Sequence, residues 1–130
     1  MLRAGGHRLA LVSNATSDTA QAWPHSRLAR RFDVAVFSCE AGIAKPDPVI
    51  YRVAAQRLGV DAADCVFVGD GGDGELAGAA AVGMTALRTT EHNDSDPRWN
   101  GPVVTALGDL PILLREMELE GRVANAGGPL

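Results

Sequence analysis

Four short apolar runs, none of which alternates with polar residues, constrain the fold of this chain more than any other feature. They lie at residues 9–12, 34–37, 65–68 and 84–87. Unbroken apolar runs of this length that contain Val are typical of strands buried on both faces of a sheet. Segments with helical periodicity separate them. The sequence therefore predicts an α/β fold, a Rossmann-like parallel sheet with helices on both faces and right-handed crossovers.

Helices are predicted at four places, residues 18–31, 47–58, 75–82 and 110–119. The first is interrupted at Pro24. The second has the strongest local signals, because Asp47 can cap it, Pro48 suits its first turn and Gly59 suits its end. Its predicted apolar stripe consists of Val49, Val53, Ala54 and Leu58. The polar segment 89–102 is predicted to be a surface loop.

The length of 130 residues allows one compact domain, and 46% apolar residues supply its core. We expect a partial core domain at residues 1–122 and a flexible, Gly- and Pro-rich tail at 123–130. Net charge is −4 without a basic block, which argues against a nucleic-acid partner. No apolar run approaches the ~20 residues of a membrane helix. The start lacks the apolar region of a signal peptide, so we expect a cytoplasmic protein with Cys39 and Cys65 as buried free thiols.

Polar side chains follow three of the predicted strands. Ser13 and Asn14 end the first, residues 38–40 the second, and Gly69 and Asp70 the third. Ligands of open parallel sheets bind at the carboxyl ends of the strands. Lys45, the single Lys among twelve basic residues, follows the second strand and directly precedes Pro46. The pattern predicts a hydroxyl, an ammonium and a cluster of carboxylates at one edge of the sheet.

Each of these residues also has a simpler interpretation. Ser13 could cap the following helix, and Lys45 could be a solvated loop residue. The acids Asp70, Asp73 and Glu75 could serve only the helix dipole. Three carboxylates within six residues on a glycine-rich loop repel one another, however, and a bound divalent cation would compensate them. Oxygen ligands of this kind suit Mg²⁺.

The ordered set of motifs resembles the haloacid dehalogenase superfamily. An apolar strand ending in Ser is followed by Lys-Pro-Asp-Pro-x-Ile-Tyr, and then by an apolar strand ending in Gly-Asp, with acids and Ala-Gly-Ala-Ala-Ala-Val-Gly-Met after it. Residues 9–14 are similar to the second motif of that superfamily, Lys45 to the third and residues 66–75 to the fourth. Each motif alone is weak, but their order and spacing agree over about residues 2–119.

The resemblance implies a hydrolase that transfers a phosphoryl group through an aspartyl intermediate. Carried onto this sequence, Ser13 binds a phosphoryl oxygen with the backbone N–H of Asn14, and Lys45 stabilises charge on the nucleophile and the phosphoryl group. Asp70 binds Mg²⁺. Metal-free dehalogenases of the superfamily depart from Gly-Asp at this point, so the resemblance favours a Mg²⁺-dependent phosphatase with a small phosphorylated substrate.

One departure from the superfamily pattern affects the acids. Glu75 stands where many members carry a second acid, and it would hold Lys45 or a metal-bound water. The position four residues after Asp70, often Asn or Asp, is Gly74, and Asp73 precedes it. The surroundings of the metal are therefore expected to be rearranged around Asp73 and Glu75.

A larger departure is the absence of the first motif, which is Asp-x-Asp after an apolar strand. No such sequence lies near the start, and Asp94-x-Asp96 follows no predicted strand. The cap that usually carries specificity is missing too. We expect a fold without its central strand, inactive alone, from a longer hydrolase. A split enzyme completed by another chain and a non-catalytic interaction module are the alternatives. Residues 9–12 and 65–68 then either close on each other or leave a gap whose strand edges invite self-association.

Overall fold

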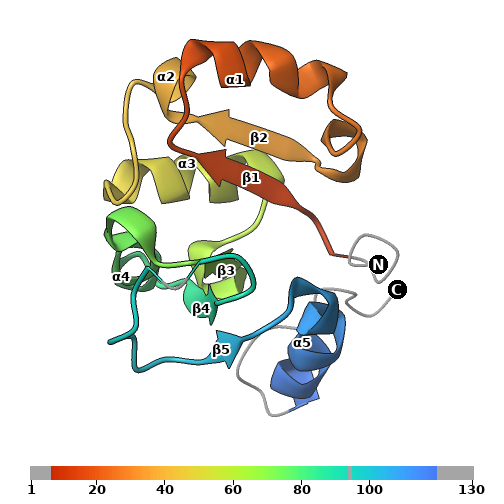
Figure 1. The fold of residues 1–130 in the computed structure, drawn as a ribbon, viewed down its shortest axis with the longest axis vertical. Helices are drawn as coiled ribbons and strands as arrows, with labels where there is room; N and C mark the ends of the chain where they lie inside the picture. Colours follow the sequence, from red (N-terminus) through yellow and green to blue (C-terminus); the bar gives the residue numbers. More distant parts are fainter. Residues whose placement is uncertain (1–6, 94, 120–130) are drawn as a thin grey trace.

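The computed structural model describes residues 7–93 and 95–119. The strands are β1 (Ala10–Ser13), β2 (Val34–Phe37), β3 (Val66–Gly69), β4 (Thr85–Thr89) and β5 (Val103–Val104). The α-helices are α1 (Ser17–Ala22), α2 (Ser38–Ala41), α3 (Pro48–Leu58), α4 (Glu75–Ala81) and α5 (Leu110–Leu119). Figure 1 shows their arrangement. The tail expected at 123–130 lies outside the described residues.

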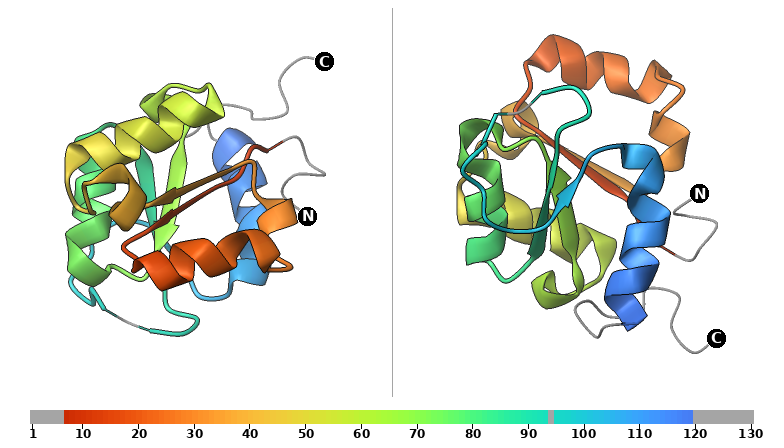
Figure 2. Two further views of the ribbon diagram at one scale, coloured as in Figure 1. Left: turned by 90° about the horizontal axis from the view of Figure 1, so that it is seen from above. Right: turned by 60° about the horizontal axis from the view of Figure 1, so that its bottom comes forward.

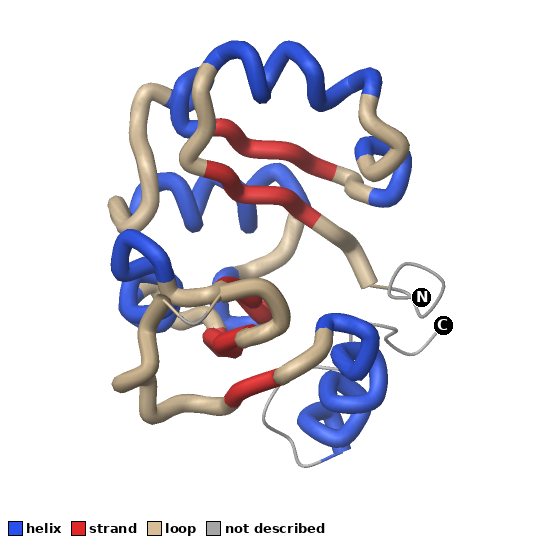
Figure 3. The backbone as a smooth tube through the Cα atoms, viewed as in Figure 1, coloured by secondary structure: helices blue, strands red, loops and turns tan. Residues whose placement is uncertain are grey.

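All strand pairs are parallel, as predicted, but the strands form two separate sheets. The first sheet is β1–β2 and the second is β3–β4–β5. Figures 1 and 3 show β1 and β3 as the strands of each sheet that lie nearest the other sheet. Within the described part of the chain, no ladder joins these two strands. Of the two outcomes that the sequence left open, the gap is the one observed.

Burial along the strands follows from this separation. Val36 and Phe37 of β2 and Ala86 and Leu87 of β4 are buried, at 5% exposure or less. Every residue of β1 and of β3 is only half-buried. The prediction that all four runs are buried on both faces is therefore wrong for β1 and β3, the two strands whose facing edges are not paired with each other within the described residues.

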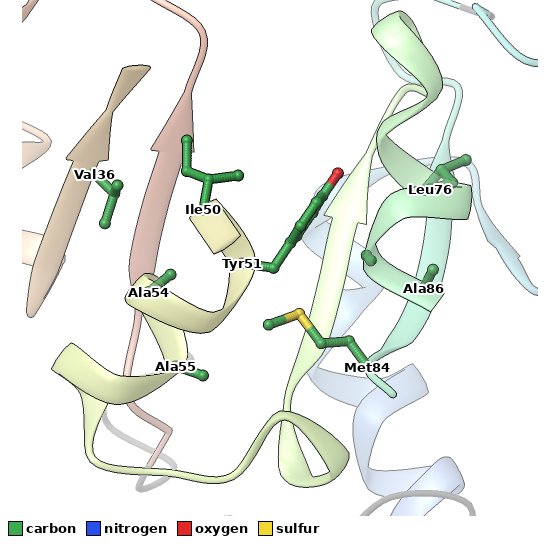
Figure 4. Packing of buried hydrophobic residues seen from close by; sticks show 9 residues of the cluster. Val36, Ile50, Tyr51, Ala54, Ala55, Leu76, Met84 and Ala86 are labelled. Carbon is green, nitrogen blue, oxygen red and sulfur yellow. The ribbon is translucent and has the colours of Figure 1, made fainter. Parts of the chain in front are cut away.

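Helix α3 bridges the two sheets on one face. Its N-cap, Asp47, accepts a hydrogen bond from the Val49 N–H at 2.9 Å, and Gly59 ends it in the left-handed conformation, as predicted. The buried side chains of α3 form one cluster with residues of β2, α4 and β4, shown in Figure 4. The cluster consists of Val36, Ile50, Tyr51, Ala54, Ala55, Leu76, Ala79, Met84 and Ala86.

The apolar stripe predicted for α3 is wrong in part. The buried residues are Ile50, Tyr51, Ala54 and Ala55, whereas Val49 is 48% exposed. A single stripe fits a helix that packs on one surface. Helix α3 contacts the first sheet and helix α4 together, so its buried face is wider and displaced toward Tyr51.

The opposite face of the sheets carries a second helical layer. Leu110, Leu114 and Met117 of α5 pack on Leu87, with Val66 and Val68 half-buried beside them. Trp23, just after α1, makes edge contacts with the rings of Phe32 and Phe37. Figure 2 shows α1 and α5 on the side of the strands opposite α3. The expectation of helices on both faces is thus confirmed.

Smaller elements account for the remaining differences. Helix α1 ends at Ala22 and a 3₁₀ turn follows at Trp23–His25, so the interruption predicted at Pro24 is confirmed. Helix α2 and strand β5 were missed because four and two residues are too few to show a period. Both cysteines are free, as expected, but Cys39 on α2 is exposed and Cys65 is half-buried. The expectation of two buried thiols is therefore wrong.

Candidate functional site

An ion pair between Lys45 and Glu75 forms the centre of the candidate site. Lys45 lies between α2 and α3, and its Nζ is 2.6 Å from Glu75 Oε1. The two side chains are 13% and 9% exposed. The expectation that Lys45 contacts a carboxylate of this edge is confirmed, and its interpretation as a solvated loop residue is wrong.

Glu75 is the first residue of α4 and is held by more than Lys45. Its Oε2 accepts a hydrogen bond from the Gly71 N–H at 3.0 Å. Its backbone oxygen accepts a bond from the Tyr51 hydroxyl at 2.8 Å. Tyr51 is fully buried, and burial together with the nearby Glu75 carboxylate raises the pKa of its hydroxyl to about 12. Each carboxylate oxygen of Glu75 therefore has a separate partner.

Aromatic rings and a glycine shape the wall beside this pair. The Phe67 ring lies 5.6 Å from Lys45 Nζ, measured to the ring centroid, within the range of a cation–π contact. The same ring meets Tyr51 edge-on at 5.4 Å. A Cβ on Gly69 would collide with Oε2 of Glu75 and lie 3.0 Å from the Phe67 ring. The glycine of the Gly-Asp sequence thus leaves space for the Glu75 carboxylate.

The loop from Asp70 to Gly74 turns on left-handed residues. Gly71 and Gly74 have φ values of 96° and 71°, and Asp73 has 58°, a conformation that Asp tolerates better than most side chains. Oδ1 of Asp70 accepts a bond from the Gly72 N–H at 2.8 Å, and its backbone oxygen accepts one from the Ser95 N–H at 3.2 Å. The loop is thus held by the Asp70 side chain and by a backbone bond from Ser95 outside it.

Ser13 and Asn14 lie at the end of β1. Ser13 is half-buried, and its hydroxyl has no hydrogen-bond partner among the described residues. Its interpretation as a helix cap is wrong, because α1 begins at Ser17 and Thr16 occupies the N-cap position. Asn14 contacts the backbone of Lys45 and lies 3.4 Å from the carboxylate of Asp73, measured between Nδ2 and Oδ2. The end of β1 and the loop after β3 therefore meet at Asn14.

The carboxylates allow a magnesium ion of the usual protein type. Among the residues that the structure describes, no three His, Cys, Asp or Glu side chains gather as a metal site. Mg²⁺ commonly takes only one or two protein carboxylates and keeps several waters. Among the described residues, the Asp70 carboxylate forms a hydrogen bond through Oδ1, and Asp73, three residues further on, is exposed. With Asp70 as its carboxylate ligand, this edge fits a water-rich Mg²⁺ site better than a closed cage.

The fold and the order of these motifs are those of a family of hydrolases. A family model, the haloacid dehalogenase-like hydrolase, matches residues 1–83. The chain belongs to this family. The match covers the first sheet, α3, the Lys45–Glu75 pair and the glycine-rich loop.

Three relatives illustrate the range of the family. Glyceraldehyde 3-phosphate phosphatase of Methanopyrus kandleri is 41% identical over 69 residues, which are 52% of this chain and 30% of that protein. (S)-2-haloacid dehalogenase 4A of Burkholderia cepacia is 30% identical over 121 residues, 89% of this chain and 52% of its own length. The crystal structure of a haloacid dehalogenase-type phosphatase from Thermococcus onnurineus superposes with a TM-score of 0.77 at 28% identity.

The superposed region covers 87% of this chain and 53% of the Thermococcus onnurineus chain. The chain thus spans about half of that structure and a third to a half of the two enzymes. Helices that could cross a membrane are not found in residues 7–93 and 95–119.

Proposed function

We propose that this chain carries the phosphate-binding and metal-binding part of a Mg²⁺-dependent hydrolase of small phosphorylated substrates. The observation that carries the proposal is the Lys45 ammonium, which is largely buried and fixed between Glu75 and the Phe67 ring at the carboxyl ends of the strands. A fixed cation at this edge stabilises negative charge that develops during phosphoryl transfer. Phosphatases among the relatives support this reaction. Because the relatives also include a dehalogenase, the preference for phosphoryl transfer rests on the Gly69-Asp70 sequence.

Each residue of the site has a separate role in binding the phosphoryl group or the metal ion. The Ser13 hydroxyl and the backbone N–H of Asn14 donate to a phosphoryl oxygen, and Lys45 neutralises charge on that group. Asp70 holds Mg²⁺, and the ion, when bound, supplies a further positive charge to the phosphoryl oxygens. Asp73 and Glu75 do not bind the ion directly, and Glu75 acts by holding Lys45.

In the complete enzyme an Asp nucleophile would form an aspartyl intermediate, which water then hydrolyses. The 130 residues contain no Asp-x-Asp directly after an apolar strand. Positioning groups do not replace a nucleophile. We therefore expect the 130-residue chain alone to bind phosphate without turning over phosphate esters.

Binding of inorganic phosphate tests the proposal without relying on turnover. Titration calorimetry with and without Mg²⁺ should show millimolar phosphate binding that requires the ion. The variants Lys45→Met and Asp70→Asn should each lose it, by about tenfold or more. Ser13→Ala should weaken phosphate binding because it removes the hydroxyl that donates to a phosphoryl oxygen, whereas Ser17→Ala, which removes an exposed hydroxyl of α1, should leave it unchanged.

Two results would count against this function. Phosphate affinity that is unchanged by Mg²⁺ and by both variants would show that the edge is not a phosphate site. Turnover of phosphate esters by the chain alone, abolished in Asp70→Asn, would point to a nucleophile within these residues.

A further inference from the structure

The side-chain amide of Asn14 pairs with both backbone groups of Lys45. Its Oδ1 accepts a hydrogen bond from the Lys45 N–H at 2.8 Å, and its Nδ2 donates to the Lys45 carbonyl at 3.0 Å. Both distances are those of well-formed bonds. An amide side chain that satisfies the N–H and the C=O of one residue fixes that residue in position and in orientation.

The same Nδ2 lies 3.4 Å from Oδ2 of Asp73, a longer and weaker contact. Asn14 follows β1 in the first sheet, whereas Asp73 follows β3 in the second. No backbone ladder joins these two strands in the described residues. Asn14 therefore gives the site a polar connection between elements that the sheets do not connect.

We propose that the Asn14 side chain is a positioning residue that holds the backbone of Lys45 so that its ammonium meets Glu75. Lys45 is held at both ends, with its backbone bonded to Asn14 and its Nζ 2.6 Å from Glu75. Removal of the Asn14 side chain frees the loop between α2 and α3. The inference rests on the proposed function only for what Lys45 does to a substrate, and the position of Lys45 is measurable without activity.

The single lysine of the chain makes a direct experiment possible. Protein labelled with ¹⁵N-lysine has one labelled backbone amide, that of Lys45, so no assignment is needed. In the unmodified chain this amide should exchange with solvent at least about tenfold more slowly than an unprotected amide, because Asn14 Oδ1 accepts its proton. Asn14→Ala should abolish the protection. Gln56→Ala, which removes an exposed amide from α3, should leave it unchanged.

Acylation of the Lys45 amine, followed by peptide mass mapping, reports where the side chain lies. We expect Asn14→Ala to raise this rate at least about threefold at a temperature where both proteins are folded. Asn14→Asp keeps the acceptor for the Lys45 N–H and removes the donor for its carbonyl, so it should retain amide protection and still raise the acylation rate. A residue needed only for stability would lower the melting temperature without changing Lys45 in the folded state.

Either of two results would overturn the proposal. The first is an unprotected Lys45 amide in the unmodified chain, a measurement that requires no variant to fold. The second is an acylation rate that stays unchanged in folded Asn14→Ala or, if that variant does not fold, in Asn14→Asp. Loss of phosphate binding with the Lys45 position intact would count against the proposed function and leave the positioning role of Asn14 standing.

Discussion

A double-mutant cycle on Lys45 and Glu75 should give a large coupling energy. Coulomb's law with an effective dielectric constant of about 20 gives roughly 6 kcal/mol for unit charges at the observed separation of 2.6 Å. Desolvation of two side chains that are about nine-tenths buried removes part of this gain. We expect a coupling of roughly 2–4 kcal/mol, against about 0.2–1 kcal/mol for exposed pairs.

The variants are Lys45→Met, Glu75→Gln and the pair together. Lys45→Met should cost about 3 kcal/mol, because it leaves the Glu75 carboxylate buried with only the Gly71 N–H as a partner. Glu75→Gln should cost somewhat less, because Gln keeps an acceptor for that N–H. The double variant should be more stable than Lys45→Met alone, since no buried charge is left without a partner.

Urea unfolding of the four proteins at pH 7 measures the coupling, with m-values compared to confirm a common transition. Repetition in 1 M NaCl should change the coupling little, because a buried pair is poorly screened. Additive single-variant effects, with a coupling below about 0.5 kcal/mol, would refute the argument that this pair is held out of water.

Three further perturbations test other contacts. Gly69→Ala should destabilise the chain by about 1–3 kcal/mol, because the added Cβ meets the carboxylate of Glu75, whereas Gly108→Ala, with open space around it, should not; equal unfolding midpoints in urea would contradict the packing. The pKa of Tyr51 is raised to about 12, so the stability that its neutral hydroxyl contributes is present below pH 10 and is lost as pH rises through 12. The loss of stability at alkaline pH should be smaller in Tyr51→Phe, and identical pH profiles of unfolding for the two proteins would contradict this role of the hydroxyl. A six-residue apolar peptide ending in Asp-x-Asp should raise the melting temperature by pairing with the open edges of β1 and β3, and a scrambled peptide should not; no difference between the two peptides would show that these edges accept no strand.

The sequence predicted those parts of the molecule that depend on local signals. Helix α3 begins after Asp47 and ends at Gly59 because a cap, a proline and a glycine act within one turn of each end. The contact of Lys45 with Glu75 was predictable as well, because parallel strands bring their carboxyl ends to one edge.

Other features depend on contacts between distant segments. The strands form two separate sheets, and β1 does not pair with β3 in the described residues. The sequence does not predict this pairing, because the apolar runs are equally compatible with one sheet or two. The buried side of α3 is set by two surfaces at once, which periodicity along one helix does not reveal. The roles of Tyr51 and Phe67 depend on contacts between distant segments, because the Phe67 ring meets Lys45 and the Tyr51 ring meets Phe67.

The position of α3 across both sheets has a consequence for how the molecule unfolds. Each sheet is built from segments close in sequence, so each half could fold as a unit of its own. Cooperativity between the halves cannot come from backbone bonds between β1 and β3, which the described residues lack. It must come from side chains: Ile50 and Tyr51, fully buried in the cluster that α3 shares with α4 and β4, and the polar contacts Lys45–Glu75 and Asn14–Asp73. These side-chain contacts thus decide whether the protein melts in one transition or in two.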